Sequence, residues 1–233
     1  YNKNHEASIK IMSHGSLKGL TSLTEGTSDL VSSSVKIPAQ MLWEAQKKSI
    51  VVKEFIIAYD IIVPIVHPSN QVKNLFQGQL ADMYSGLIKD WKDVEVEPGK
   101  IIVVDRDDSS GTKLLMNERF FELKKPLETS IKVKSDADVV QYIAKNPSAV
   151  GYVSKRFVNT SVKAVTVNGF AGSVENVEKK YYPLYRELYI YTNEKAYIGD
   201  VKSFIDLCTS KAGQDMMEKS GFIPVERINK PAK

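Results

Sequence analysis

Three short loops of this chain are rich in glycine and small hydroxyl residues. They are Ser13-His14-Gly15-Ser16, Ser32-Ser33-Ser34, and the segment from Arg106 to Thr112. Each follows a short β-like run, and two of them lead into helical patterns. The start of a helix presents unpaired backbone N–H groups at the positive end of its dipole, and hydroxyls add further donors. Such loops suit the binding of an anion, which needs neither a metal nor covalent chemistry.

Arg106 adds a fixed positive charge to the third loop. Its planar guanidinium suits the oxygens of phosphate or carboxylate. The neighbouring acids Asp105, Asp107 and Asp108 are expected to orient Arg106 or to cap the following helix. Serine-rich loops before helices often serve only as N-caps, and His14 alone resembles an ordinary polar loop residue. The spacing therefore indicates an anion site in general, without selecting phosphate.

The segment Ser110-Gly111-Thr112-Lys113 also matches S-x-x-K, the nucleophile motif of penicillin-recognising acyl enzymes. The supporting S-D-N and K-T-G elements are absent, and the P-loop pattern is not matched. A serine acyl enzyme is therefore kept only as a distant alternative. We expect no enzyme, no metal and no cofactor.

The composition is that of a globular protein with an ample core. The chain has 233 residues, of which 42% are hydrophobic, and its formal net charge is +4. This mild excess is too small to indicate a nucleic-acid partner. Cys208 is the single cysteine and lies on an apolar helical stripe, so we expect it in the core. No apolar stretch approaches the roughly 18 residues of a transmembrane helix.

Strand and helix patterns alternate along the chain, which predicts an α/β fold. Residues 101–104 form a β-branched run typical of a strand buried in a parallel sheet, directly before Arg106. Helical stripes follow at residues 139–144 and 201–208. If the chain forms two lobes, residues 55–66 and 183–191 are the best candidates for the strands that cross between them.

Several blocks of the sequence together resemble one known family. "IIVVDRDDSSGTK" is similar to the strand–Arg–x3–Ser-Gly-Thr–helix segment of PstS proteins, the phosphate-binding proteins of bacterial phosphate ABC transporters. Further blocks follow in the family's order: "SHGSLKGLTSLTEGTSDLVSSS", "IIAYDIIVPIVHPSNQVKNLFQGQLADMYSGLIKDWKDV", "VVQYIAKNPSAVGYVS", "YPLYRELYIYT" and "AGQDMMEKSGFIPV". The resemblance covers nearly the whole chain.

The resemblance implies a two-lobe, type II periplasmic-binding-protein fold, each lobe a mixed, mostly parallel sheet flanked by helices, with the ligand in the cleft. Lobe 1 would comprise residues 1–66 and 186–233, and lobe 2 residues 67–185. The implied function is capture of inorganic phosphate by hinge closure and its delivery to a membrane ABC permease. The protein would be a monomer in the periplasm or outside the cell.

The resemblance also implies a set of phosphate ligands. From lobe 2, Arg106 would supply charge, Ser110 and Thr112 hydroxyls, and Gly111 a backbone N–H group. From lobe 1 the two other loops would close the site, with the residues His14, Gly15, Ser16, Ser33 and Ser34.

Two departures from the family pattern keep alternatives open. The sequence begins after the family's first strand, its Ser/Thr loop and its first helix, so those parts are expected to be missing, together with any N-terminal membrane anchor. Ser34 stands where some members carry an Asp that accepts the proton of hydrogen phosphate. A binder of another oxyanion such as sulfate, or a sensor or adhesion module that kept the fold, remains an alternative.

Overall fold

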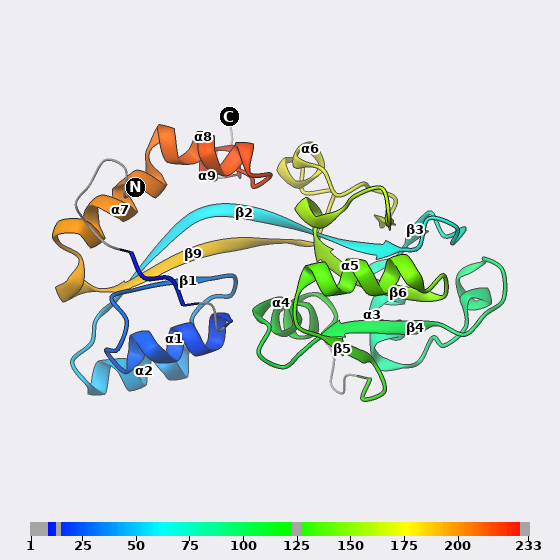
Figure 1. The fold of residues 1–233 in the computed structure, drawn as a ribbon, viewed down its shortest axis with the longest axis horizontal. Coiled ribbons are helices and arrows are strands. Elements are labelled where there is room, and N and C mark those ends of the chain that lie inside the picture. The colour runs from blue at the N-terminus through cyan, green and yellow to red at the C-terminus, as the bar shows by residue number, and fades with distance from the viewer. Residues whose placement is uncertain (1–8, 13–14, 123–126, 229–233) are drawn as a thin grey trace. The chain divides into compact units, whose positions relative to one another are not determined.

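The computed structural model describes residues 9–12, 15–122 and 127–228, and it divides into two compact units (Figure 1). Unit 1 comprises Tyr1–Tyr59 and Glu187–Lys233, and unit 2 comprises Asp60–Arg186. The chain passes between the units inside two strands, β2 (Val52–Val66) and β9 (Tyr185–Asn193). The sequence-based lobe limits fall in these same two strands. Which residues move together as a lobe stays a prediction.

Unit 1 is built on the strand order β1-β9-β2, with β1 (Leu30–Ser33) antiparallel to β9. Helices α1 and α2 lie on one face of this sheet, and α7 and α8 lie on the other (Figure 1). The helices of the unit are α1 (Ser16–Thr24), α2 (Ala39–Lys47), η4 (Glu194–Ala196), α7 (Gly199–Thr209), α8 (Lys211–Lys219) and α9 (Val225–Ile228).

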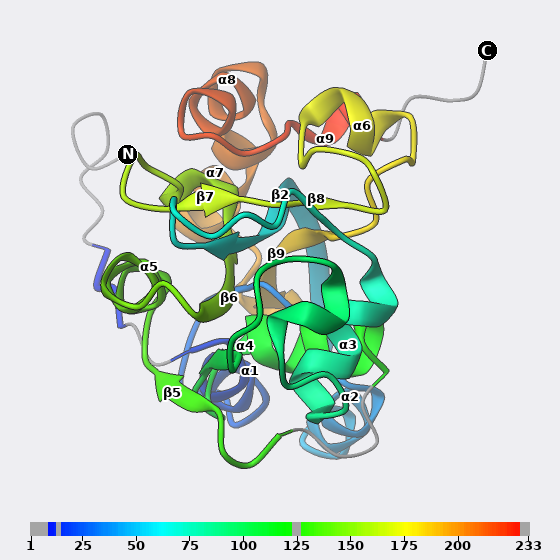
Figure 2. The same cartoon turned by 90° about the vertical axis from the view of Figure 1, so that its right-hand side faces the viewer.

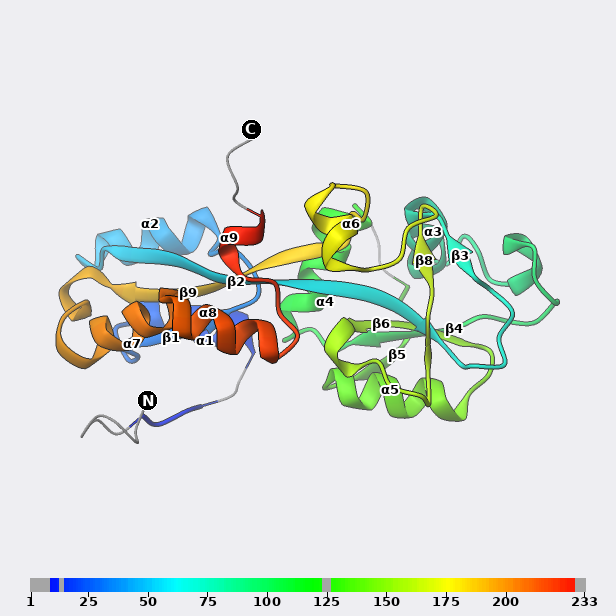
Figure 3. The same ribbon diagram turned by 90° about the horizontal axis from the view of Figure 1, so that it is seen from above.

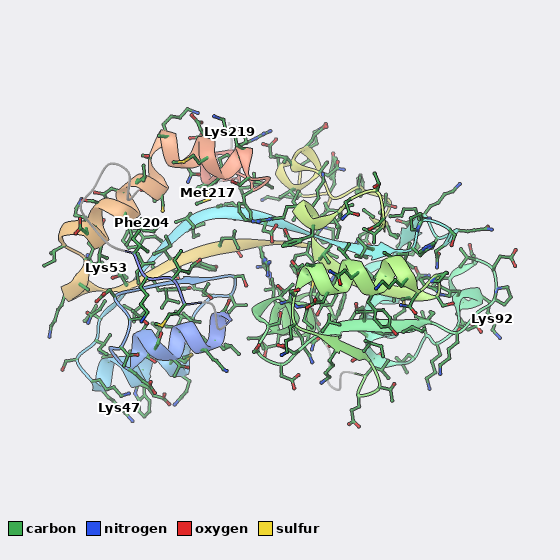
Figure 4. The ribbon with its side chains drawn as sticks, viewed as in Figure 1. Lys47, Lys53, Lys92, Phe204, Met217 and Lys219 are labelled. Carbon is green, nitrogen blue, oxygen red and sulfur yellow. The ribbon has the colours of Figure 1, made fainter. Side chains whose placement is uncertain are left out.

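The core of unit 1 confirms the apolar stripe at residues 201–208. Ile205 and Cys208 on α7 are buried against Ile57 and Ile190 of the sheet. Phe204 and Met217, labelled in Figure 4, pack against the same cluster from α7 and α8. Cys208 is therefore a core residue, as the sequence predicts.

Unit 2 is built on the strand order β2-β6-β4-β5, with β7 paired to β2. Strand β4 runs parallel to both β5 and β6, whereas β6 and β7 run antiparallel to β2. A separate ribbon pairs β3 with β8. The strands are β3 (Asn74–Leu75), β4 (Ile102–Arg106), β5 (Ile131–Val133), β6 (Ala149–Ser154), β7 (Lys163–Ala164) and β8 (Thr166–Val167). The α/β class with mixed sheets is thus confirmed.

Helices cover both faces of the unit 2 sheet, α5 on one and α3 on the other (Figures 2 and 3). Val139, Val140 and Ile143 form the buried face of α5, as their spacing predicts. The helical segments are α3 (Gln77–Ser85), η1 (Trp91–Val94), α4 (Gly111–Leu115), η2 (Met116–Phe120), α5 (Asp136–Lys145), η3 (Lys155–Phe157) and α6 (Val174–Glu178). Among the described helices, none has both the length and the apolar character needed to cross a bilayer.

Candidate functional site

The carboxyl ends of three strands meet at one edge of the unit 2 sheet, because β4 is parallel to β5 and β6. Arg106 is the last residue of β4, Ser154 the last of β6, and Asp136 opens α5 just after β5. This edge is where open α/β sheets bind their ligands. The cation of Arg106, the carboxylate of Asp136 and the hydroxyl of Ser154 thus lie at the same edge of the sheet.

The guanidinium of Arg106 is held at this edge by two hydrogen bonds, but one of its donors has no acceptor in the part of the chain that the structure describes. Its Nη1 donates to Asp136 Oδ1, and its Nη2 donates to the Lys134 carbonyl at 2.7 Å. The Arg106 side chain is only 14% exposed, yet its buried Nε–H has no hydrogen-bond partner among the described residues. Buried donors without a partner are rare in proteins and call for an acceptor such as a bound ion. An oxyanion would provide that acceptor.

The loop between Arg106 and α4 is stiffened by its own side chains. Asp107 accepts hydrogen bonds from the Ser109 hydroxyl at 2.6 Å and the Ser109 backbone N–H at 3.0 Å. The hydroxyl bond is the main reason that the pKa of Asp107 is lowered. Ser110 caps α4 by accepting from the Lys113 N–H at 3.3 Å. The capping role that serine loops often play is therefore real here, although it still leaves the Ser110 proton to donate.

Thr112, in the first turn of α4, contacts a buried ion pair. Its Oγ1 accepts a hydrogen bond from Arg186 Nη1 at 2.6 Å. The same guanidinium donates to Asp60 Oδ2 through Nε at 3.1 Å and Nη2 at 2.8 Å. Ser154 donates its hydroxyl to Asp60 Oδ1 at 2.6 Å, and its backbone N–H to Asp136 Oδ2 at 3.3 Å. A continuous polar network therefore runs from Arg106 to Thr112.

In unit 1 the structure brings Ser16 and Ser34 together. Their hydroxyl oxygens are 3.2 Å apart, and the Ser34 N–H donates to Ser16 Oγ at 3.1 Å. Gly15, just before α1, has φ of 85°, a conformation that favours glycine. Ser33 is buried and donates its hydroxyl to the Val35 carbonyl at 2.8 Å, so that proton is already used. His14 lies outside the described residues.

Comparisons with known proteins decide the family. Residues 1–212 match the model of the PBP superfamily domain. PstS of Staphylococcus aureus (strain USA300) is 30% identical over 94% of this chain and 70% of its own length. PstS of Borreliella burgdorferi is 29% identical over 97% of this chain and 83% of its own. The chain belongs to the PstS family of phosphate-binding proteins.

Solved structures agree with this family assignment. A putative phosphate ABC transporter substrate-binding protein from Clostridium perfringens, with bound phosphate, has a TM-score of 0.84 and 32% identity. The match covers 91% of this chain and 85% of that one. An ABC-type phosphate transport receptor from Vibrio cholerae has a TM-score of 0.81 and 29% identity, covering 96% and 91%. The resemblance read from the sequence is confirmed.

Lys113, the lysine of the S-x-x-K segment in this PstS-family protein, lies between two carboxylates. Its Nζ is 3.2 Å from Asp105 Oδ2 and 2.6 Å from Asp108 Oδ1. Burial alone would lower the pKa of Lys113, but the hydrogen bond to Asp108 and the charge of Asp105 outweigh it and raise the pKa. A lysine held as a cation by two carboxylates is a poor base for Ser110. Within the described residues, no group of His, Cys, Asp or Glu is arranged to hold a metal ion.

Sequence reasoning missed three charged residues of the unit 2 network: Asp60, Asp136 and Arg186. Asp60 interrupts the apolar part of β2, and that interruption was an available signal. Arg186 stands beside Glu187 near the start of β9, where the sequence does not mark it as buried. Asp136 lies between Ser135 and Asp138, which form a capping box at the start of α5. In the sequence it therefore looks like an ordinary acidic residue in the first turn of a helix.

Proposed function

We propose that this protein captures inorganic phosphate outside the cytoplasm and delivers it to a membrane ABC permease. The observation that carries the proposal is the buried Nε–H of Arg106, a charged donor with no acceptor among the described residues. Homologous proteins named for phosphate binding, and a related structure with bound phosphate, support phosphate as the acceptor. The ion would be released unchanged, and the protein would act as a monomer in the periplasm or on the outer cell surface.

The proposed ligands in unit 2 are Arg106, Ser110, Gly111 and Thr112. In unit 1, Ser16, Ser34 and the backbone around Gly15 supply a second group of donors, and hinge closure brings both groups to one ion. Ser33 is left out as a hydroxyl donor because its proton is bonded to Val35. Each charge-assisted hydrogen bond contributes about 1.5–3 kcal/mol, so about four of them offset the dehydration of the ion.

The test is titration calorimetry with the Arg106→Ala variant. We expect tight phosphate binding by the wild-type protein and no measurable binding by the variant, while its circular dichroism stays unchanged. Arg156→Ala removes the same charge from an exposed position and should bind as the wild type does. Unchanged phosphate affinity in Arg106→Ala would defeat the assignment. Sulfate, titrated in parallel, decides whether the protein selects phosphate despite having Ser34 in the second loop.

A complementary test asks whether Ser110 acts as a nucleophile. An acylating serine reagent should leave Ser110 unlabelled, since Lys113 is engaged by Asp105 and Asp108. Stoichiometric labelling of Ser110, detected by mass spectrometry, would instead support the acyl-enzyme alternative.

A further inference from the structure

The buried residue Arg186 makes contacts that a purely structural ion pair would not need. Arg186 is 6% exposed and its partner Asp60 is 2% exposed. Two of its nitrogens, Nε and Nη2, grip one carboxylate oxygen of Asp60, whereas Nη1 reaches Thr112. Because the guanidinium is planar and held by this grip, the direction of the Nη1–H bond is fixed.

The consequence for Thr112 follows from the chemistry of a hydroxyl group. A threonine hydroxyl has one proton and accepts through its lone pairs, whereas a guanidinium can only donate. Thr112 Oγ1 must therefore accept from Arg186 at 2.6 Å, and its own proton is turned away from the guanidinium. Thr112 is thus prepared as a donor, which is what an oxyanion requires.

Asp60 keeps Arg186 from acting as a competing anion ligand. The carboxylate neutralises the guanidinium at 2.8 Å, and Ser154 occupies its other oxygen at 2.6 Å. Ser154 also donates to Asp136, the partner of Arg106. Thr112 and Arg106 are therefore held by two chains of hydrogen bonds that meet at Ser154, one through Asp60 and Arg186 and the other through Asp136.

We infer that Arg186 is a positioning residue for phosphate binding, acting through Thr112 rather than by touching the ion. The inference rests on the proposed function, since it names what prepares one of the proposed ligands.

The test is a double-mutant cycle on phosphate affinity, built from Arg186→Lys and Thr112→Val. Lysine keeps the charge beside Asp60 but offers one point donor, so it cannot hold Asp60 and Thr112 together as arginine does. We expect Arg186→Lys to weaken phosphate binding about tenfold, the worth of about one hydrogen bond. In the Thr112→Val background the same substitution should change the affinity by less than about twofold, because the hydroxyl is already gone.

Arg156→Lys is the matched control, the same change on an exposed side chain, and should leave the affinity unchanged. A loss that is equal in both backgrounds would overturn the inference, and would point to direct contact with the ion or to general loosening. A wild-type protein that binds no phosphate would overturn the proposed function and this inference with it. If Arg186→Lys does not fold, the neutral pair Asp60→Asn with Arg186→Gln takes its place in the cycle.

Discussion

At the scale of single residues, the position of Arg106 depends on the buried carboxylate beside it. Asp105 accepts hydrogen bonds from the Tyr152 hydroxyl at 2.5 Å and from the Arg106 backbone N–H at 2.8 Å. Burial, and then the charge of Asp105, raise the pKa of Tyr152 well above its usual value, so Tyr152 stays a donor. Asp105 therefore fixes the backbone from which the Arg106 side chain extends.

Removing the Tyr152 hydroxyl should weaken the fold measurably. Tyr152→Phe leaves the buried Asp105 without one donor, and we expect the free energy of unfolding to fall by about 1–3 kcal/mol in urea denaturation. Tyr181→Phe removes a hydroxyl from an exposed ring that stacks on Phe170, and should change stability by less than about 0.5 kcal/mol. Equal effects of the two substitutions would show that Asp105 does not depend on Tyr152.

Asp107 gives a prediction for pH dependence. Its pKa is lowered chiefly by the Ser109 hydroxyl, so Ser109→Ala should raise that pKa toward the usual value, followed by NMR titration of the carboxyl carbon. Because the folded-state pKa lies below the unfolded one, the stabilisation is complete above about pH 4. It is lost as the pH falls through the lowered folded pKa. The stability difference between wild type and Ser109→Ala should therefore shrink in acid, and a constant difference would contradict this account.

At the scale of elements, strong local patterns made the strands and helices around the site predictable. The β-branched run at residues 101–104 became β4, and the stripe of Val139, Val140 and Ile143 became the buried face of α5. Arg106 could be placed after β4 for the same reason. These predictions succeeded because burial of one apolar face decides both kinds of element locally.

The polar network was beyond sequence reasoning because its contacts are not local. Asp60 and Arg186 lie on β2 and β9, and only the sheet arrangement brings them together. A charged residue that is buried in a strand needs a partner, but the sequence does not say which residue that partner is. The inward turn of the Ser33 hydroxyl was equally hidden, because it depends on the exact path of the backbone toward Val35.

The packing of α5 on β6 can be tested with a glycine pair. A Cβ atom on Gly151 would lie 2.7 Å from Val139 Cγ1, so in Gly151→Ala either the Val139 side chain or helix α5 must shift. We expect a loss of about 1–3 kcal/mol in thermal or urea unfolding, with weaker phosphate binding because α5 carries Asp136. Gly78→Ala in α3 meets nothing within 4 Å and should be neutral or stabilising by up to about 1 kcal/mol. A neutral Gly151→Ala would show that this contact yields readily.

At the scale of the whole molecule, each unit carries its own hydroxyl donors. Unit 1 holds Ser16 and Ser34, and unit 2 holds Ser110 and Thr112 beside Arg106. The chain enters and leaves unit 2 on β2 and β9, and the Asp60–Arg186 ion pair joins those two strands at the limits of the unit. An ion that used donors from both units would therefore protect backbone amides in segments of both units.

Hydrogen exchange with and without phosphate measures this protection of backbone amides directly. A ligand that binds only the native state slows exchange of the amides it secures, by up to about 100-fold at a concentration of 100 Kd. We expect slower exchange both at residues 106–113 and at residues 15–17 and 33–35, because donors in all three segments would bind the same ion. Arg106→Ala at the same phosphate concentration should lose protection in every segment, including those of unit 1. Protection confined to residues 106–113 would mean that unit 2 holds the ion alone, and Ser16 and Ser34 would then be ordinary loop residues.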